Sequence, residues 1–124
     1  MTALIKRYGV YFTSVIINGV QMDCVIDTGS TDCCLTKEFV SQLVKSKNIK
    51  WNDFVAPKKF QTAGGISTEE GLVLRSVTIG NVTVKDVSAS VSHVTEFCLI
   101  GMSFLDKLKS WTIYPSALRI EFSG

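Results

Sequence analysis

Hydrophobic residues occur along this chain in short runs that are rich in β-branched and aromatic side chains and end at glycine-containing turns. The first two runs, at residues 8–17 and 20–26, are joined by Asn18-Gly19, the dipeptide that most strongly indicates a β-hairpin. The pattern predicts a mostly β fold of roughly eight to ten short strands. Further strand-like runs lie at residues 33–35, 72–79, 82–91, 97–101, 110–114 and 117–122.

Two segments have the spacing of helices instead of strands. Apolar residues recur at helical intervals over residues 37–45, and Thr36 is placed to cap the N-terminus of that helix. A second, shorter helix is predicted over residues 102–108. We interpret the first helix as structural, and we expect residues 48–57 to be less regular.

Length and composition place the chain among compact globular domains. It has 124 residues, of which 46% are hydrophobic and 19% are charged, so we assign residues 1–124 to a single domain. The net charge of +2 indicates neither a nucleic-acid surface nor an acidic substrate. No apolar run approaches the roughly 20 residues that span a bilayer, and residues 1–7 lack the order of a signal peptide. We therefore expect neither a nucleic-acid partner nor a membrane-spanning segment.

The cysteines are interpreted as free thiols that pack as small hydrophobic side chains. They contain no CxxC pair, and together with His93 they lack the spacing of a zinc site, so we expect no metal and no cofactor. His93 itself lies in a polar loop and is interpreted as a surface residue. Free thiols favour a reducing compartment, which predicts a cytoplasmic location. The four cysteines are Cys24, Cys33, Cys34 and Cys98.

A single acidic residue, Asp27, stands at the end of the buried strand predicted for residues 20–26. Thr28 can satisfy local polar groups with its hydroxyl, and Gly29 permits a tight turn and the close approach of another molecule. Together with Ser30, these residues form a loop that presents a carboxylate on a rigid strand at the edge of a core. We select this loop as the candidate site.

A second candidate feature is a projecting hairpin over residues 58–71. Its strand-like arms meet at Gly64-Gly65, and paired glycines let the backbone itself contact a ligand. An ordinary hairpin turn is the alternative interpretation. In addition, the apolar strand, glycine and helix around residues 98–105 weakly repeat the order of elements around Asp27.

Three motifs carry a likeness to a known family. They are Asp27-Thr28-Gly29-Ser30-Thr31-Asp32, the glycine-tipped hairpin, and Leu99-Ile100-Gly101-Met102-Ser103-Phe104-Leu105. In this order they resemble the motifs of retropepsin-like (clan AA) aspartic proteases, most closely the single-domain bacterial type. The resemblance covers nearly the whole chain, from about Tyr8 to Phe122. It implies a closed β-barrel, the half-domain of an acid protease, with one or two short helices.

The resemblance implies a role for each residue of the first motif. Asp27 matches the catalytic aspartate. Thr28, Gly29 and Ser30 match the active-site loop, in which the threonine hydroxyl ties two such loops together and the substrate backbone passes beside the glycine.

The other motifs match the surroundings of that loop. Residues 99–101 correspond to the strand that braces it, and residues 118–122 correspond to a C-terminal strand that pairs across a dimer. Gly64 departs from the bacterial pattern, which has asparagine there, and Cys33-Cys34 replaces the usual aliphatic residues. The implied substrate-binding flap consists of Thr62, Ala63, Gly64 and Gly65.

The chain contains only one Asp-Thr-Gly, whereas this chemistry needs two carboxylates that share a proton. The chain is also about half the size of a two-lobed enzyme of this type. We therefore expect a homodimer in which the two copies of Asp27 face each other across a twofold axis. The predicted function is that of an aspartic endopeptidase acting on peptides or proteins, with bulky apolar residues preferred beside the scissile bond.

Other interpretations remain open from the sequence. The chain could be a dimerisation or peptide-binding module with weak turnover, although an unneeded buried acid pair would cost stability. A redox or metal protein that uses the cysteines is a further alternative. A periplasmic or membrane-anchored location stands beside the cytoplasmic one, because many members of the family carry an anchor. Asp32 is expected to make local hydrogen bonds and to take no part in catalysis.

Overall fold

A computed structural model describes residues 2–62 and 64–123 of the chain. The described residues form eleven strands, two α-helices and two 3-10 turns. The mostly β fold with two short helices is therefore confirmed. The elements are β1 (Thr2–Ala3), β2 (Ile5–Arg7), β3 (Val10–Ile17), β4 (Val20–Ile26), β5 (Cys33–Thr36), α1 (Lys37–Lys45), η1 (Trp51–Asp53), β6 (Phe54–Thr62), β7 (Gly65–Ile79), β8 (Val82–Ser92), β9 (Cys98–Ile100), α2 (Met102–Leu105), β10 (Ser110–Tyr114), η2 (Pro115–Ala117) and β11 (Arg119–Ser123).

One eight-stranded sheet makes up most of the molecule. Its strand order is β2-β3-β4-β9-β5-β8-β7-β6, and a further pairing joins β3 to β7 through Ile16↔Thr78 and Ile17↔Val77. Because β3 and β7 lie near opposite ends of that order, their pairing closes the strands between them into a barrel. A separate small sheet has the order β1-β11-β10.

The β3–β4 hairpin follows from its turn sequence. Asn18 and Gly19 have φ angles of 48° and 87°, the left-handed backbone that a tight two-residue hairpin turn requires. The register runs without interruption from Ile17↔Val20 to Phe12↔Val25. The predicted hairpin is thereby confirmed, and its second strand leads directly to Asp27.

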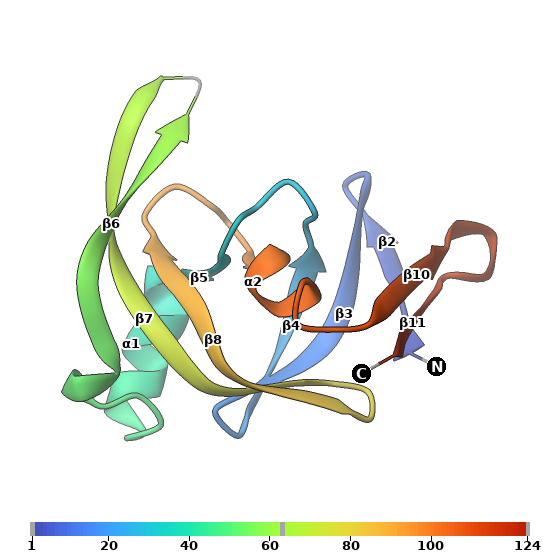
Figure 1. The fold of residues 1–124 in the computed structure, drawn as a ribbon, viewed down its shortest axis with the longest axis horizontal. Helices are drawn as coiled ribbons and strands as arrows, with labels where there is room; N and C mark the ends of the chain where they lie inside the picture. The colour runs from blue at the N-terminus through green and yellow to red at the C-terminus, as the bar shows by residue number, and fades with distance from the viewer. Residues whose placement is uncertain (1, 63, 124) are drawn as a thin grey trace.

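Helix α1 begins and ends as the sequence predicts. The Thr36 hydroxyl accepts a hydrogen bond from the Phe39 backbone N–H at 3.2 Å, which caps the helix N-terminus. Phe39, Val40 and Leu43 form its buried face and pack into the hydrophobic core. The helix lies against the outside of the sheet, near the stem of the long β6–β7 hairpin (Figure 1).

Three of the cysteines belong to the core. Cys24, Cys33 and Cys98 are buried among aliphatic and aromatic side chains, and Cys34 is half-buried. All four are free, as the sequence predicts. No described helix is long and apolar enough to cross a membrane.

Some element boundaries differ from the prediction. β7 is one strand of 15 residues that continues from the projecting hairpin into the barrel, where two separate segments were expected. β6 begins at Phe54, within the segment expected to be irregular, because it pairs with the barrel end of β7. α2 ends at Leu105, and β11 begins only at Arg119 because Leu118 has a left-handed φ of 48°.

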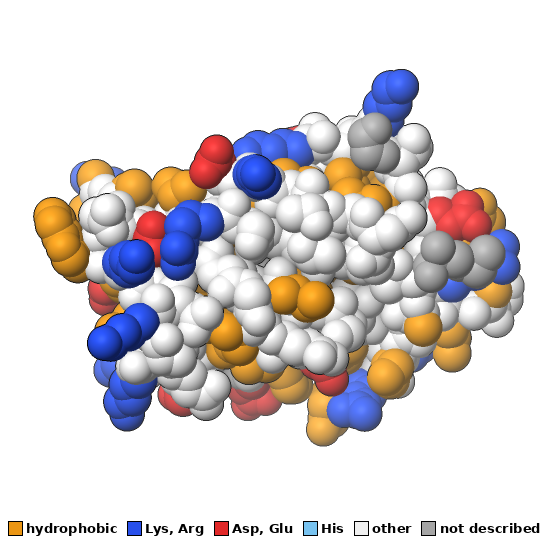
Figure 2. Space-filling view, turned by 90° about the horizontal axis from the view of Figure 1, so that it is seen from below, with side chains coloured by type: hydrophobic (Ala, Val, Ile, Leu, Met, Phe, Trp, Pro, Cys, Tyr) orange, Lys and Arg blue, Asp and Glu red, His pale blue; other side chains and the backbone are white. Residues whose placement is uncertain are grey.

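The β6–β7 hairpin projects well beyond the barrel, on the side where the loop between β4 and β5 also rises (Figure 1). Seen from below, the molecule has lysine and arginine side chains most densely over the end that carries α1, whereas hydrophobic and acidic side chains are scattered (Figure 2).

Candidate active site

The backbone of Asp27 is fixed by two strands that are distant in sequence. β4 and β9 are parallel neighbours, with Val25 opposite Leu99 and Ile26 opposite Ile100. The Asp27 N–H donates to the Ile100 carbonyl oxygen at 2.9 Å. The two segments that echo each other in the sequence are thus side by side, and the second braces the end of the first.

A short local turn orients the Asp27 side chain. Its Oδ1 atom accepts a hydrogen bond from the Gly29 N–H at 2.9 Å, and the Ser30 N–H donates to the Asp27 carbonyl oxygen at 3.2 Å. A Cβ on Gly29 would lie 3.3 Å from Oδ1, so glycine leaves the carboxylate its room. Asp27 is half-buried, and among the described residues only Oδ1 of its carboxylate accepts a hydrogen bond, which leaves Oδ2 for a ligand or a second carboxylate.

Gly101 supports the loop from below. A Cβ at this position would lie 2.5 Å from the Ser30 carbonyl oxygen and closer still to that of Asp32. The next residue, Met102, donates its N–H to the same Ser30 oxygen at 2.8 Å. The loop therefore rests on backbone that only a residue without a side chain can supply.

Thr28 and Gly29 form the exposed crest of the loop. Within residues 2–62 and 64–123, the Thr28 hydroxyl has no hydrogen-bond partner. Ser30 is turned inward, and its hydroxyl donates to the Asp32 carbonyl oxygen at 2.6 Å and lies 3.6 Å from the Cys34 sulfur. The structure thus brings the predicted loop residues together at the end of β4.

Asp32 makes the expected local hydrogen bond through its backbone, where its carbonyl oxygen accepts the Ser30 hydroxyl, but its side chain bonds to a residue that is distant in sequence. Its Oδ2 atom forms an ion pair with Lys58 Nζ at 2.6 Å, across 26 positions of sequence. The sequence carries no signal for this contact, because Lys58 comes from β6 and nothing local relates it to the loop.

The hairpin expected to form a flap is present. Thr62 is opposite Gly65 in the β6–β7 register, and Gly65 has a φ of 117°, which disfavours any residue with a side chain. Gly64 is exposed. Ala63 lies outside the described residues. The ends of β6 and β7 that face the tip rise apart from the loop between β4 and β5 (Figure 1).

Buried thiols lie directly beneath the site. The hydrogen bond with the Cys98 thiol and then burial raise the pKa of Cys24, and burial raises the pKa of Cys33 against the opposing effect of Ser103. A raised pKa keeps these thiols neutral and unreactive. Among the described residues, no group of three or more His, Cys, Asp or Glu side chains is arranged to hold a metal ion.

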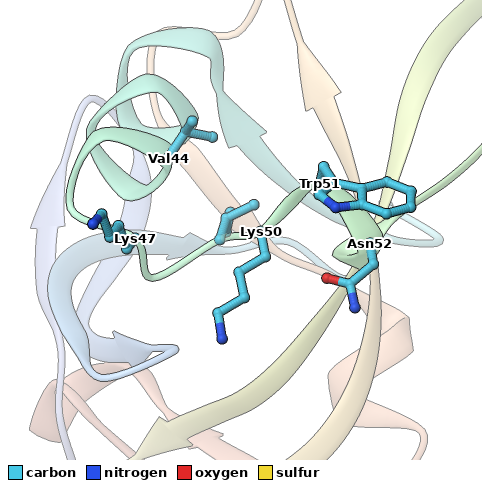
Figure 3. A pocket seen from close by; sticks show the side chains of 6 residues that line it. Val44, Lys47, Lys50, Trp51 and Asn52 are labelled. Carbon is cyan, nitrogen blue, oxygen red and sulfur yellow. The ribbon is translucent and has the colours of Figure 1, made fainter.

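Three surface pockets are formed by described residues, and Asp27 lines none of these three. One, of about 450 Å³, is lined by the end of α1 and the segment that follows it, including Val44, Lys50 and Trp51 (Figure 3). Because Thr28 and Gly29 are exposed and Asp27 is half-buried, the candidate site is an open loop on this single chain.

Comparison with known proteins identifies the family. A sequence model of the family described as "gag-polyprotein putative aspartyl protease" matches residues 13–107, which include the candidate loop and most of the barrel. The chain belongs to the retropepsin-like aspartyl protease family. The motifs quoted from the sequence therefore identified the family correctly.

Known structures and sequences agree with that assignment. This retropepsin-like chain superposes on the crystal structure of a retropepsin-like aspartic protease from Rickettsia conorii with a TM-score of 0.77 and 26% identity, covering 99% of this chain and 89% of that one. Uncharacterised proteins from Rickettsia prowazekii and a Sinorhizobium species are 27% and 25% identical over 115 and 116 residues, covering 92% and 91% of this chain. The chain spans about half the length of these two relatives, 48% of each.

Proposed function

We propose that this retropepsin-like chain hydrolyses peptide bonds as a homodimer in which each copy contributes one Asp27 carboxylate. The observation that carries the proposal is the presentation of Asp27. Its carboxylate is half-buried, is oriented by the Gly29 N–H, and stands at the end of a strand braced by β9. Members of this family act on peptides and typically dimerise, which supports the same reading.

Peptide hydrolysis by two carboxylates requires that they share one proton. At about 3 Å apart, two carboxylates cannot both ionise cheaply, so one is charged and the other is protonated; aspartic proteases are the established example of this arrangement. The charged Asp27 takes a proton from a water molecule, whose oxygen attacks the carbonyl carbon. The protonated Asp27 of the other copy gives its proton to the carbonyl oxygen, which forms a neutral tetrahedral diol. The Asp27 that took the proton from water then gives it to the amide nitrogen as the C–N bond breaks, and the other Asp27 takes a proton from one hydroxyl of the diol. The products are a carboxylic acid and an amine, and the pair again holds one proton.

A symmetric dimer supplies the second carboxylate without a second Asp-Thr-Gly in the chain, because the same residue is present on both sides of the axis. The exposed crest at Thr28 and Gly29 is the surface that such a partner would cover. Substrate would lie as an extended strand between the loop and the β6–β7 hairpin, held by backbone hydrogen bonds. The bulky apolar preference beside the scissile bond is part of this proposal.

The decisive experiment profiles cleavage of a peptide library by the wild type, by Asp27→Asn and by Asp23→Asn. Asp23 is exposed on the same strand, so it is a matched control for the loss of one carboxylate. We expect Asp27→Asn to abolish cleavage and Asp23→Asn to leave it intact. Equal cleavage by wild type and Asp27→Asn would overturn the mechanism. Binding of a statine-type inhibitor by a wild type that cleaves nothing would instead favour a peptide-binding module.

A further inference from the structure

Lys58 stands at the point where the projecting hairpin leaves the barrel. β7 pairs with β8 from Gly71 to Ile79, whereas the part of β7 from Gly65 to Glu70 pairs only with β6. Lys58 is opposite Glu69, just beyond the last position that β8 supports. Two strands without a third are only marginally stable, so the contacts at this boundary decide where the hairpin points.

A β-bulge turns Lys58 toward the body of the molecule. The register passes from Val55↔Gly71 to Lys58↔Glu69, which leaves Ala56 and Pro57 opposite the single residue Glu70. Proline has no N–H to donate, so a bulge is a position that it tolerates within a sheet. A bulge also increases local twist and redirects the side chains that follow it.

Gly71 makes room for the bulged strand. A Cβ on Gly71 would lie 2.8 Å from the Ala56 carbonyl oxygen and 3.1 Å from Cε of Lys58. Gly71 therefore lets the bulge and the Lys58 side chain cross close to the β7 backbone. The aliphatic part of the lysine is packed there, and its ammonium group is carried inward.

The Lys58 ammonium bonds to two other elements. Nζ is 2.6 Å from Asp32 Oδ2 and also donates to the Ser88 hydroxyl on β8. The Lys58 and Asp32 side chains are only 24% and 11% exposed, so solvent screens this ion pair less than a surface pair. Ser88 in turn accepts, through its carbonyl oxygen, a 2.7 Å hydrogen bond from the Ser103 hydroxyl on α2.

Asp32 connects Lys58 to the candidate loop. Its carbonyl oxygen accepts the Ser30 hydroxyl at 2.6 Å, and Ser30 is joined by its N–H to the Asp27 carbonyl oxygen. A continuous series of bonds thus runs from the hairpin stem through Asp32 and Ser30 to Asp27.

From this geometry we propose that Lys58 is a positioning residue that fixes the stem of the flap hairpin relative to the loop carrying Asp27. The proposal rests on the proposed function, since the hairpin is taken to cover substrate. Without the tether, the two-stranded hairpin opens more often and samples positions away from the loop, and the free enzyme must order it before substrate can bind.

The test uses hydrogen exchange and kinetics on four variants. Lys58→Met removes the charge and keeps the packed stem, and Lys58→Arg keeps a cation that can donate to Asp32. Lys59→Met is the matched control, because Lys59 is the exposed next residue on β6 and its side chain points to the other side. Lys58→Met combined with Asp32→Asn leaves no unpaired buried charge, so this protein folds even if the single Lys58→Met does not.

We expect backbone amides of residues 54–56, 58–61 and 66–71 to exchange at least about tenfold faster in Lys58→Met and in the double variant, with core amides of β3 and β4 unchanged. Lys59→Met and Lys58→Arg should match the wild type. In peptide cleavage, KM should rise about tenfold with kcat changed less than about threefold, the signature of a lost binding contribution.

Equal amide exchange in Lys58→Met and Lys59→Met would overturn the proposal that Lys58 positions the hairpin. Fast exchange in Lys58→Arg would also overturn it, because the effect would then come from packing and not from the ion pair. The exchange measurement needs no peptidase activity. A wild type that cleaves no peptide therefore refutes the proposed function while the exchange data still decide whether Lys58 orders the hairpin.

Discussion

At the scale of single residues, the site depends on backbone approaching backbone at Gly101. A methyl group there would meet the Ser30 and Asp32 carbonyl oxygens, neither of which can move without distorting the loop. The φ of Gly101 is −105°, an ordinary value, so crowding alone would cause the damage. We expect Gly101→Ala to lower the free energy of unfolding by about 1–3 kcal/mol. Urea denaturation measures the loss, with Ser110→Ala as a control at an exposed position. Equal denaturation midpoints for Gly101→Ala and Ser110→Ala would contradict the prediction.

A second residue-scale prediction concerns Glu69 on the hairpin stem. Burial raises the pKa of its carboxyl, an effect that the nearby His93 partly offsets, and within the described residues its Oε2 atom is buried without a hydrogen bond. A raised pKa means that the folded state binds the proton more tightly than the unfolded state does. Its contribution to stability is therefore present in acid and is lost as pH rises through the raised pKa.

Glu69→Gln should remove that pH-dependent loss, so the variant gains stability relative to the wild type as pH rises from about 4 to about 8. Urea midpoints across this range measure the difference. Glu96→Gln, which changes an exposed carboxylate, is the control, and its urea midpoint should change with pH as that of the wild type does. A constant offset between Glu69→Gln and wild type at every pH would refute the assignment.

At the scale of elements, the clearest test is the N-terminus of α1. The Thr36 hydroxyl supplies the cap, and a lost cap of this kind costs about 1 kcal/mol. Thr36→Ala should therefore lower the denaturation midpoint, and Thr36→Ser, which keeps the hydroxyl, should restore most of it. If serine and alanine destabilise equally, the packing of the threonine methyl group outweighs the cap.

Local chemistry explains which elements could be predicted. Asn18-Gly19 and Thr36 act within a few residues, so α1 was found with both its ends and the β3–β4 hairpin with its turn, whereas β3 begins two residues later than predicted because Tyr8 and Gly9 form a turn. The apolar run over residues 20–26 likewise placed Asp27 at the end of a strand. The bulge at Ala56 and Pro57 was missed because it depends on pairing with β7, and the ion pair from Lys58 to Asp32 depends on that bulge.

At the scale of the whole molecule, the proposed site is half of a structure that only a second copy completes. Dissociation must then remove catalysis, since a single chain presents one Asp27. Specific peptidase activity should fall on dilution in parallel with the dimer fraction measured by sizing. A tandem fusion of two copies should resist dilution, and a fusion with Asp27→Asn in one half should be inactive. A monomer with full activity would contradict the homodimer.

The exposed Thr28 hydroxyl provides the sharpest form of this test. If two loops are tied together across the axis, Thr28→Val removes the tie and keeps the side chain's shape. The protein concentration at which half of the specific activity is lost, the activity midpoint, should then rise. The urea midpoint of the isolated chain should stay unchanged, because Thr28 is exposed and its hydroxyl has no partner within the described residues. Thr83→Val is the control for the activity measurement: it removes an exposed hydroxyl on β8 that bonds to Thr78, and it should leave the activity midpoint unshifted. An unshifted activity midpoint in Thr28→Val would mean that the dimer forms through other surfaces. A lowered urea midpoint would mean that Thr28 stabilises its own chain.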